Sequence, residues 1–285
     1  MKSLHIVLLL AITLLGSCFR IPAKIEPGKS ISVQRYATMP KAASECSGIV
    51  QMNDEWIILN DGSFGPRLLR LSKDGQDSLG IIEIPEVTNK DWEAIAIYED
   101  EIIIGDVGNN LGNRKDLRIY HIDQKTRKLK HTVPIDYPDQ VTFDVKKHDF
   151  DCEAMIILDG QYYLFSKNRS KNKTKVYSAP LLTNNLVLID SISLEGMVTD
   201  AAYHAESKTF VLTCYEVGLG GFKNSLALVE RNAEGKFRTT NIFNLKPAEQ
   251  IEAIVQIEGN QFLVGSESGF LGNGRHLYLV TIEGL

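Results

Sequence analysis

Short apolar segments recur along the chain and are separated by polar, turn-forming residues. Five of them share an opening pattern: a residue that is mostly apolar or β-branched, an oxygen-bearing residue, Gly or Ala, and an apolar residue. They are Cys46–Ile49, Trp92–Ile95, Cys152–Met155, Thr199–Ala202 and Ile251–Ile254. Their oxygen-bearing positions (47, 93, 153, 200 and 252) are 46, 60, 47 and 52 residues apart. Recurrence at such an interval predicts five similar structural units.

Each opening segment is followed by a polar turn and then by further short strands, rich in β-branched and aromatic residues. The second strands are expected at 56–59, 102–104, 162–165, 210–212 and 262–264. The third strands are expected at 68–71, 117–120, 175–177, 226–229 and 277–280. Fourth strands follow in the first four units, for example at 80–84 and 186–194. Four short strands per repeat are typical of the blades of a β-propeller.

The fifth unit ends at Leu285 and has no room for a fourth strand. The segment Ser30–Tyr36, which precedes the first unit, can supply that strand. Pairing of the N- and C-terminal strands would close the ring and leave fewer exposed sheet edges. The sequence therefore predicts an all-β, five-bladed β-propeller over residues 30–285, with six blades as the alternative. Two stacked sheets would leave the matched motifs unexplained.

The first residues have the pattern of an export signal. Lys2 is followed by the largely apolar run Ile6–Leu15 and by Leu-Gly-Ser-Cys at residues 15–18. The run is shorter than the roughly 20 residues that a membrane-spanning helix needs. Leu-Gly-Ser-Cys resembles the lipobox of bacterial lipoproteins, in which the cysteine becomes the first mature residue and carries acyl chains such as palmitate. We expect a signal peptide at 1–17, a lipidated Cys18 and a tether at 18–29.

These residues imply an exported protein that Cys18 anchors to the lipid bilayer of a bacterial membrane, in the outer membrane or cell envelope. An ordinary cleaved signal with an incidental cysteine is the alternative. The net charge of −5 argues against a nucleic-acid partner, which would need a concentrated basic face. The basic run Lys167–Lys175 is interpreted as a solvated hairpin loop, and we expect a monomer. Cys46, Cys152 and Cys214 are interpreted as buried thiols, with a disulfide as the alternative.

The motifs place a candidate metal site on the propeller axis. The first strand of each blade lies innermost, so the oxygen-bearing residues should converge at one mouth of the central channel. No Lys or Arg occurs inside the motifs to neutralise four carboxylates there. Ca²⁺ accepts about six to eight oxygen ligands in flexible geometry, which would solve this charge problem. Alternatively, these carboxylates accept backbone N–H groups of adjacent blades or bind water. The residues that converge are Ser47, Glu93, Glu153, Asp200 and Glu252.

Several of these motifs together resemble a known family. Ser47-Gly48-Ile49, the run 60–63 (NDGS), the run 91–96 (DWEAIA) and the run 103–106 (IIGD) are similar to calcium-activated nucleotidases, the apyrases. The chain looks even more similar to uncharacterised bacterial lipoprotein propellers that carry DWEA followed by GDxGNN. The resemblance implies a five-bladed propeller with a central calcium ion held by Ser and Glu side chains. By position it makes ligands of Ser47, Glu93, Glu153 and Glu252, with Thr199 or Asp200 completing the ring.

The chain departs from the apyrase pattern after the second strand of the second unit. There the apyrases carry a Gly-rich stretch that ends in Lys-Glu-Trp, whereas this chain has Gly108-Asn109-Asn110. Part of the pattern associated with nucleotide hydrolysis is therefore missing. The resemblance supports the fold and the metal more than the activity.

Two functions remain open. The first is a non-catalytic module in which calcium is structural and the mouth binds a small molecule, a glycan or a protein. The second is a calcium-dependent hydrolase of phosphoanhydrides or phosphoesters, in which the metal polarises a phosphoryl oxygen or orients water. Whether the chain is an enzyme stays open at this point. Candidate catalytic residues for the second function are Asp61, Asp106, Asn109, Arg114, Lys167, Arg169 and Glu216.

Overall fold

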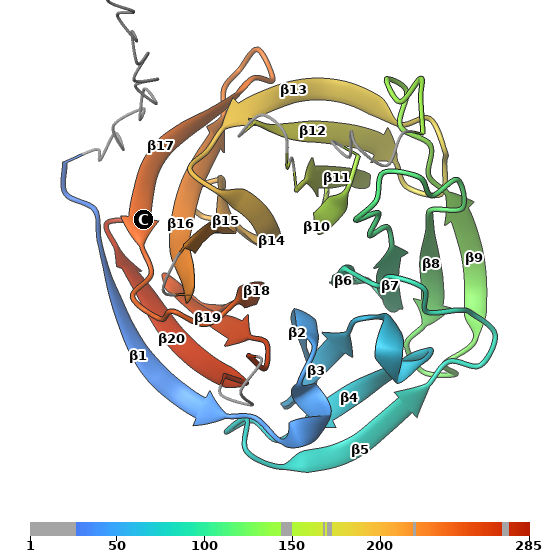
Figure 1. Cartoon of the computed structure of the whole chain (residues 1–285), viewed down its shortest axis with the longest axis horizontal. Coiled ribbons are helices and arrows are strands. Elements are labelled where there is room, and N and C mark those ends of the chain that lie inside the picture. The colour runs from blue at the N-terminus through green and yellow to red at the C-terminus, as the bar shows by residue number, and fades with distance from the viewer. Residues whose placement is uncertain (1–26, 144–149, 168, 170–172, 219–220, 270–273) are drawn as a thin grey trace, which may run out of the picture.

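The computed structural model describes residues 27–143, 150–167, 169, 173–218, 221–269 and 274–285. These residues form twenty β-strands in five four-stranded sheets, together with two short 3-10 helices. Figure 1 shows the five sheets arranged as blades around a central axis. The prediction of an all-β, five-bladed β-propeller is confirmed. Among the described residues, no helix is long and apolar enough to cross a membrane.

In each blade the strands run from the axis to the rim in the same order. Blade one contains β2 (Cys46–Met52), β3 (Glu55–Asn60), β4 (Arg67–Leu71) and β5 (Ser78–Glu83). Blade two contains β6 (Ala94–Tyr98), β7 (Glu101–Asp106), β8 (Arg118–Asp123) and β9 (Leu129–Pro134). Blade three contains β10 (Cys152–Leu158), β11 (Gln161–Ser166), β12 (Lys173–Pro180) and β13 (Val187–Ser193). Blade four contains β14 (Met197–His204), β15 (Thr209–Gly218), β16 (Gly221–Arg231) and β17 (Phe237–Asn244).

Blade five combines the two ends of the described chain. It contains β18 (Ile251–Glu258), β19 (Gln261–Ser266), β20 (His276–Glu283) and, as its outermost strand, β1 (Ser30–Thr38). The β1–β20 pairing is antiparallel and extends from the Ser30–Glu283 pair to the Thr38–His276 pair. The predicted closure of the ring by the N-terminal strand is therefore confirmed.

The hydrophobic core lies between neighbouring blades, in five clusters that follow the ring. Each blade is covered on both faces, which explains why the second strands are continuous apolar runs rather than alternating ones. Trp92 is fully buried between blades one and two, and its indole N–H donates to the carbonyl of Thr88 at 2.9 Å. Cys46, Cys152 and Cys214 are buried and free, as interpreted from the sequence.

A β-bulge marks the start of the innermost strand in four blades. The extra residue of the bulge is Ser47 in β2, Glu153 in β10, Thr199 in β14 and Glu252 in β18. The register thus places Thr199, and not Asp200, in the oxygen-bearing position of blade four. Asp200 takes the position that Gly or Ala occupies elsewhere, so the motif alignment of blade four was wrong by one residue.

Candidate metal centre

The bulged residues form a ring of side chains at one mouth of the central channel. A bulge turns its extra residue away from the ladder, and here all four of these residues are at most 5% exposed. In blade two, β6 begins only after Glu93, at Ala94, and the Glu93 amide instead donates to the carbonyl of Gly105 at 3.0 Å. Every blade therefore contributes one oxygen-bearing side chain to this ring: Ser47, Glu93, Glu153, Thr199 and Glu252.

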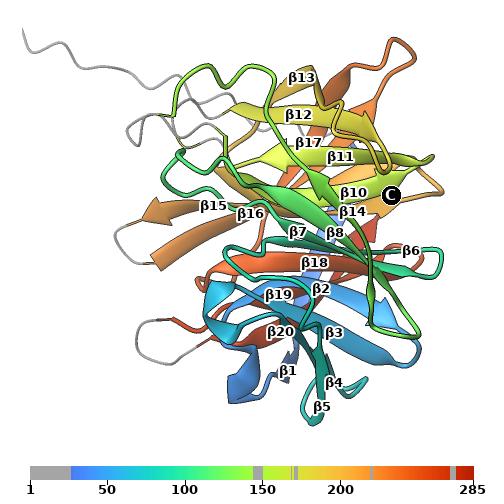
Figure 2. The ribbon, with the colours of Figure 1, turned by 90° about the vertical axis from the view of Figure 1, so that its right-hand side faces the viewer.

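A second set of side chains comes from the segments that follow the second strands. The amides of Asp61, Lys167 and Glu267 each donate to a carbonyl just before the first strand of the same blade, at 2.7–3.1 Å. Tyr215 pairs with Met197 in the same way at the start of β14. These short connections keep the following side chains at the same mouth as the ring. Figure 2 shows that the β15–β16 hairpin of blade four extends beyond the neighbouring strands.

Lys167 occupies the mouth and corrects one expectation. Its ammonium Nζ lies 2.9 Å from Oε2 of Glu153 and 3.3 Å from Oε1 of Glu252. The side chain is 5% exposed and also lies over the ring of Tyr215, at 5.2 Å from its centroid. The interpretation of Lys167 as part of a solvated loop is therefore wrong. A basic residue from outside the motifs does reach their carboxylates, which the sequence had not indicated.

Three carboxylates on the other side of the mouth form an acidic triad: Asp61, Asp91 and Glu93. One oxygen from each lies within 4.8 Å of the others. Asp61 follows β3 of blade one, while Asp91 and Glu93 precede β6 of blade two. Among the described residues, no Lys, Arg or His is ion-paired with any of the three. The triad therefore concentrates acidic groups at a blade boundary, with no ion-paired cation in the described part of the chain.

The protonation of the triad reflects this charge. Burial, followed by the charge of Asp61, raises the pKa of Asp91 to about 7. Burial and the nearby charge of Glu153 raise the pKa of Glu93 well above its ordinary value. Carboxyl groups of this kind either keep their protons or share a bound cation. In addition, the buried Oε1 of Glu153 has no hydrogen-bond partner among the described residues, so an acceptor is left for a further ligand.

Glu267 and Glu252 share one proton on the fifth blade. Burial and the charge of Glu252 raise the pKa of Glu267 to about 10, so Glu267 is protonated at neutral pH and shares its hydrogen bond with Glu252. Burial opposes the ionisation of Glu252, but the charge of Lys167 and the bonds from Glu267 and Gln250 lower its pKa overall. Glu252 therefore carries the charge that Lys167 balances.

These residues suit a hard cation. The triad offers oxygen atoms only, and no Cys or His joins it among the described residues. Oxygen ligands select Ca²⁺, Mg²⁺ and Mn²⁺ over softer metals. Asp91 was missed as a candidate, although its position two residues before Glu93 is a usable signal, because alternate residues of an extended segment face the same way.

The hydroxyl and carboxyl groups of Ser47, Thr199 and Asp200 already have protein partners. The Ser47 hydroxyl donates to the carbonyl of Glu45 at 3.2 Å, and that of Thr199 lies 2.9 Å from the carbonyl of Ile251. The Asp200 carboxylate accepts the amide of Ile254 in blade five at 2.7 Å and its neighbour's amide at 2.8 Å. Asp200 thus links two adjacent innermost strands.

Most of the candidate catalytic residues form a structural network at the rim of the mouth. The buried Asp106 pairs with Arg114 at 2.9 Å, and the buried Asp151 pairs with Arg169 at 3.1 Å. Asn109 joins the two pairs, because its amide donates to Asp151 at 2.6 Å and its side-chain oxygen accepts the Arg114 amide at 2.9 Å.

Glu216 lies apart from this network. It sits on the β15–β16 hairpin, where its half-exposed carboxylate is 3.6 Å from the ammonium of Lys223. The structure therefore brings Asp61 and Lys167 together with the axial carboxylates and leaves Glu216 outside.

The chain matches no model of a known protein family and no curated protein sequence. Among solved structures it is similar to the PQQ-bound aldose sugar dehydrogenase of Streptomyces coelicolor, with 10% identity, a TM-score of 0.52 and coverage of 89% of this chain and 99% of that one. Kuenenia stuttgartiensis hydrazine synthase matches with 13% identity, a TM-score of 0.45 and coverage of 85% of this chain and 64% of that one.

A structural genomics protein of unknown function from Bacteroides thetaiotaomicron matches with 10% identity, a TM-score of 0.46 and coverage of 90% of this chain and 76% of that one. At these identities the similarity concerns the fold alone. By fold, the chain is a β-propeller, and the comparisons identify no family for it.

Proposed function

We propose that the protein is a membrane-anchored β-propeller that binds a divalent cation, Ca²⁺ foremost, at its axial mouth and uses that mouth as a ligand-binding face. The acidic triad carries this proposal, because three carboxylate oxygens lie within 4.8 Å of one another without a paired cation among the described residues. The buried Oε1 of Glu153 supports it from the neighbouring blade three, because this atom has no hydrogen-bond partner among the described residues. A bound cation would allow these carboxyl groups to ionise together.

Calcium suits this site better than magnesium. The triad comes from two blades, and its members lie on irregular segments before β6 and after β3. Ca²⁺ tolerates irregular coordination and variable ligand number, whereas Mg²⁺ requires a near-ideal octahedron. A cation at the triad would join blade one to blade two, while Lys167 joins blade three to blade five through Glu153 and Glu252. The metal is therefore proposed to stabilise the ring.

The arrangement favours binding over hydrolysis. Arg114 and Arg169 were candidates to stabilise phosphate charge, but each is engaged by a buried aspartate. Lys167 is engaged by two glutamates. The mouth would keep a structural ion and bind a small molecule, a glycan or a protein around it.

Calcium titration of two matched variants tests the metal site. Asp91→Asn removes one charge from the triad, and Asp54→Asn removes one exposed charge from the β2–β3 turn of blade one. By isothermal calorimetry we expect one Ca²⁺ per chain for the unchanged protein and for Asp54→Asn. Asp91→Asn should weaken binding by at least about tenfold, because losing a charged ligand costs on the order of 1.4 kcal/mol or more.

Removal of the metal provides the second readout. EDTA should lower the melting temperature of the unchanged protein, and added Ca²⁺ should restore it. A melt that EDTA leaves unchanged, together with no calcium by elemental analysis, would refute the metal proposal.

The membrane anchor is proposed from the sequence, since residues 1–17 and Cys18 lie outside the described residues. Cells that express the chain should incorporate labelled palmitate into it and retain it in the membrane fraction. Cys18→Ser should abolish the label and release the protein, because a lipid chain supplies the affinity for the bilayer. Unchanged fractionation of Cys18→Ser would contradict the anchor.

A further inference from the structure

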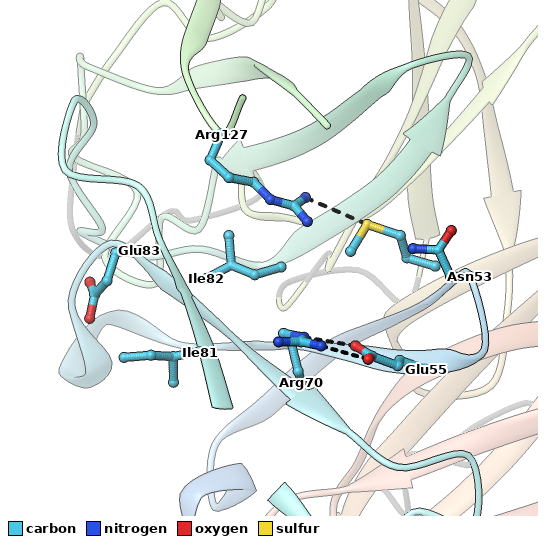
Figure 3. Close-up of a pocket in the computed structure, with 8 residues that line it drawn as sticks. Asn53, Glu55, Arg70, Ile81, Ile82, Glu83 and Arg127 are labelled. Atoms are coloured by element: carbon cyan, nitrogen blue, oxygen red, sulfur yellow. Dashed lines mark hydrogen bonds and ion pairs between the residues drawn. The ribbon is translucent and has the colours of Figure 1, made fainter. Parts of the chain in front are cut away.

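A polar cavity of about 360 Å³ lies between blades one and two, at the ends of the blades remote from the axial mouth. Figure 3 shows its residues. Arg127, in the turn between β8 and β9, faces the β2–β3 turn and the Arg70–Glu55 pair of blade one. A cavity of this size is within the range of small-molecule sites, which is about 300–1,000 Å³.

The turn that carries Arg127 is well ordered by its own side chains. The carboxylate of Asp123 accepts the amide of Thr126 at 2.6 Å and its hydroxyl at 2.7 Å. The Arg127 amide donates to the carbonyl of Asp123 at 2.9 Å, and the residue has a positive φ of 63°. These bonds fix the backbone from which the guanidinium extends toward blade one.

In the part of the chain that the structure describes, the guanidinium of Arg127 forms no ion pair with an acidic residue. Its Nη1 lies 3.7 Å from the thioether sulfur of Met52, which is a weak acceptor. Among the described residues, no carboxylate lies within ion-pair distance of Arg127. Burial and the like charge of Arg70 lower the pKa of Arg127, and the more weakly acting charges of Asp123 and Glu55 offset this only in part. An arginine that is partly desolvated and faces a like charge has unused capacity to bind an anion.

Glu55 lines the same cavity, but its carboxylate is already paired with Arg70. The Nε and Nη2 atoms of Arg70 donate to the two carboxylate oxygens of Glu55 at 2.8 and 2.6 Å. Figure 3 shows the remaining acidic residue, Glu83, at the far side of the cavity from the guanidinium of Arg127. Among the described residues, the cavity therefore presents one guanidinium without an ion pair beside the Arg70–Glu55 pair.

We propose that this cavity binds a small ligand through an oxyanion, either a carboxylate or a phosphate group, held by the guanidinium of Arg127. The planar fork of arginine matches both groups. Asn53 lines the same cavity and adds an amide donor. Ile81, which is 48% exposed, lines the opposite side and offers an apolar surface for the body of the ligand. The site is separate from the axial metal centre and does not depend on it.

Methionine-methyl NMR tests this proposal locally. The chain has five methionines, and Met52 lies against the guanidinium of Arg127. Sodium phosphate and sodium succinate are titrated separately at constant ionic strength, with sodium chloride and neutral succinamide as controls. We expect a saturable shift of the Met52 methyl signal with at least one of the two oxyanions. The signals of Met39, Met155 and Met197, which do not line the cavity, should stay in place.

Two matched variants assign the effect to Arg127. Arg127→Gln and Lys128→Gln each remove one positive charge from the same turn, but Lys128 does not line the cavity. Arg127→Gln should weaken binding by at least about tenfold, and Lys128→Gln should leave it unchanged. Arg127→Lys keeps the charge without the fork and should recover only part of the affinity.

Each result has a definite meaning. A response to succinate alone identifies a carboxylate ligand, a response to phosphate alone identifies a phosphate ligand, and either supports the site. No saturable Met52 shift with either oxyanion would overturn the proposal, as would equal binding by folded Arg127→Gln. Calcium binding at the axial mouth should be the same in all these proteins, so failure here would not affect the proposed function.

Discussion

Lys167 brings a positive charge from outside the repeat motifs to the mouth of the channel. Its ammonium group lies between the carboxylates of Glu153 and Glu252 and so acts as a cation that belongs to the chain. Burial opposes its charge, but the carboxylates around it raise the pKa of Lys167 well above its ordinary value and keep it charged. Lys167 thus balances Glu153 and Glu252 by direct ion pairs, whereas the acidic triad has no ion pair among the described residues.

Replacement of Lys167 should expose this role. Lys167→Met leaves Glu153 and Glu252 buried without their partner, which should cost about 3–5 kcal/mol of unfolding free energy in the absence of metal. Added Ca²⁺ should stabilise Lys167→Met more than the unchanged protein, because the freed carboxylates offer further ligands. Urea unfolding with and without Ca²⁺ measures both effects.

A matched control uses a surface ion pair. Lys130→Met removes the lysine that pairs with Glu101 at a more exposed site, and it should change neither the stability nor its calcium dependence appreciably. Equal calcium stabilisation of Lys167→Met and the unchanged protein would contradict a cation-like role for Lys167.

At this scale the sequence predicted part of the site. Glu93, Glu153 and Glu252 follow from their place in the repeat. Lys167 could not be predicted in the same way, because it lies outside the motifs and its contact with Glu252 joins residues 85 positions apart. Nothing local distinguishes it from the other lysines of its basic run. Asp91 could have been found from the period of two in extended chain.

The β-bulge at the start of an innermost strand determines which side chain faces the ring. The bulge in β14 selects Thr199 as the residue that faces the ring and leaves Asp200 in the ladder beside β18. The motif alignment predicts Asp200 at this position, because a carboxylate matches the glutamates of blades two, three and five. A one-residue change of register moves a side chain to the opposite face of a strand, so motif alignment cannot decide between adjacent polar residues.

The position of Asp200 in the ladder predicts that its replacement affects stability and leaves calcium binding unchanged. Asp200→Ala leaves the buried amide of Ile254 without its acceptor, which should cost about 1–3 kcal/mol of unfolding free energy. Asp200→Asn keeps an acceptor and should cost less. Because Asp200 bonds to the neighbouring strand, neither variant should weaken calcium binding, as calorimetry can show. A loss comparable to that of Asp91→Asn would place Asp200 among the metal ligands.

For the whole molecule, the repeat predicted the architecture. Five matched motifs fixed the number of blades, and the missing last strand of the fifth unit pointed to Ser30–Tyr36, which the β1–β20 pairing confirms. The fold could be predicted from the sequence because each blade repeats the same apolar pattern and packs against two neighbours. The cavity beside Arg127 could not be predicted from the repeat, since it joins residues of β2–β5 in blade one to a single turn residue of blade two.

Closure through β1 also determines how the chain could be reconnected. The first residue of β1, Ser30, pairs with Glu283, so the two ends of the propeller meet at one corner of blade five. A short linker could join them, and new ends could be opened in another surface turn, as circular permutation of compact domains allows. Opening the turn between β17 and β18, for instance, would give a chain in which all five blades form from consecutive strands. The same five-bladed ring is therefore compatible with more than one order of strands along the chain.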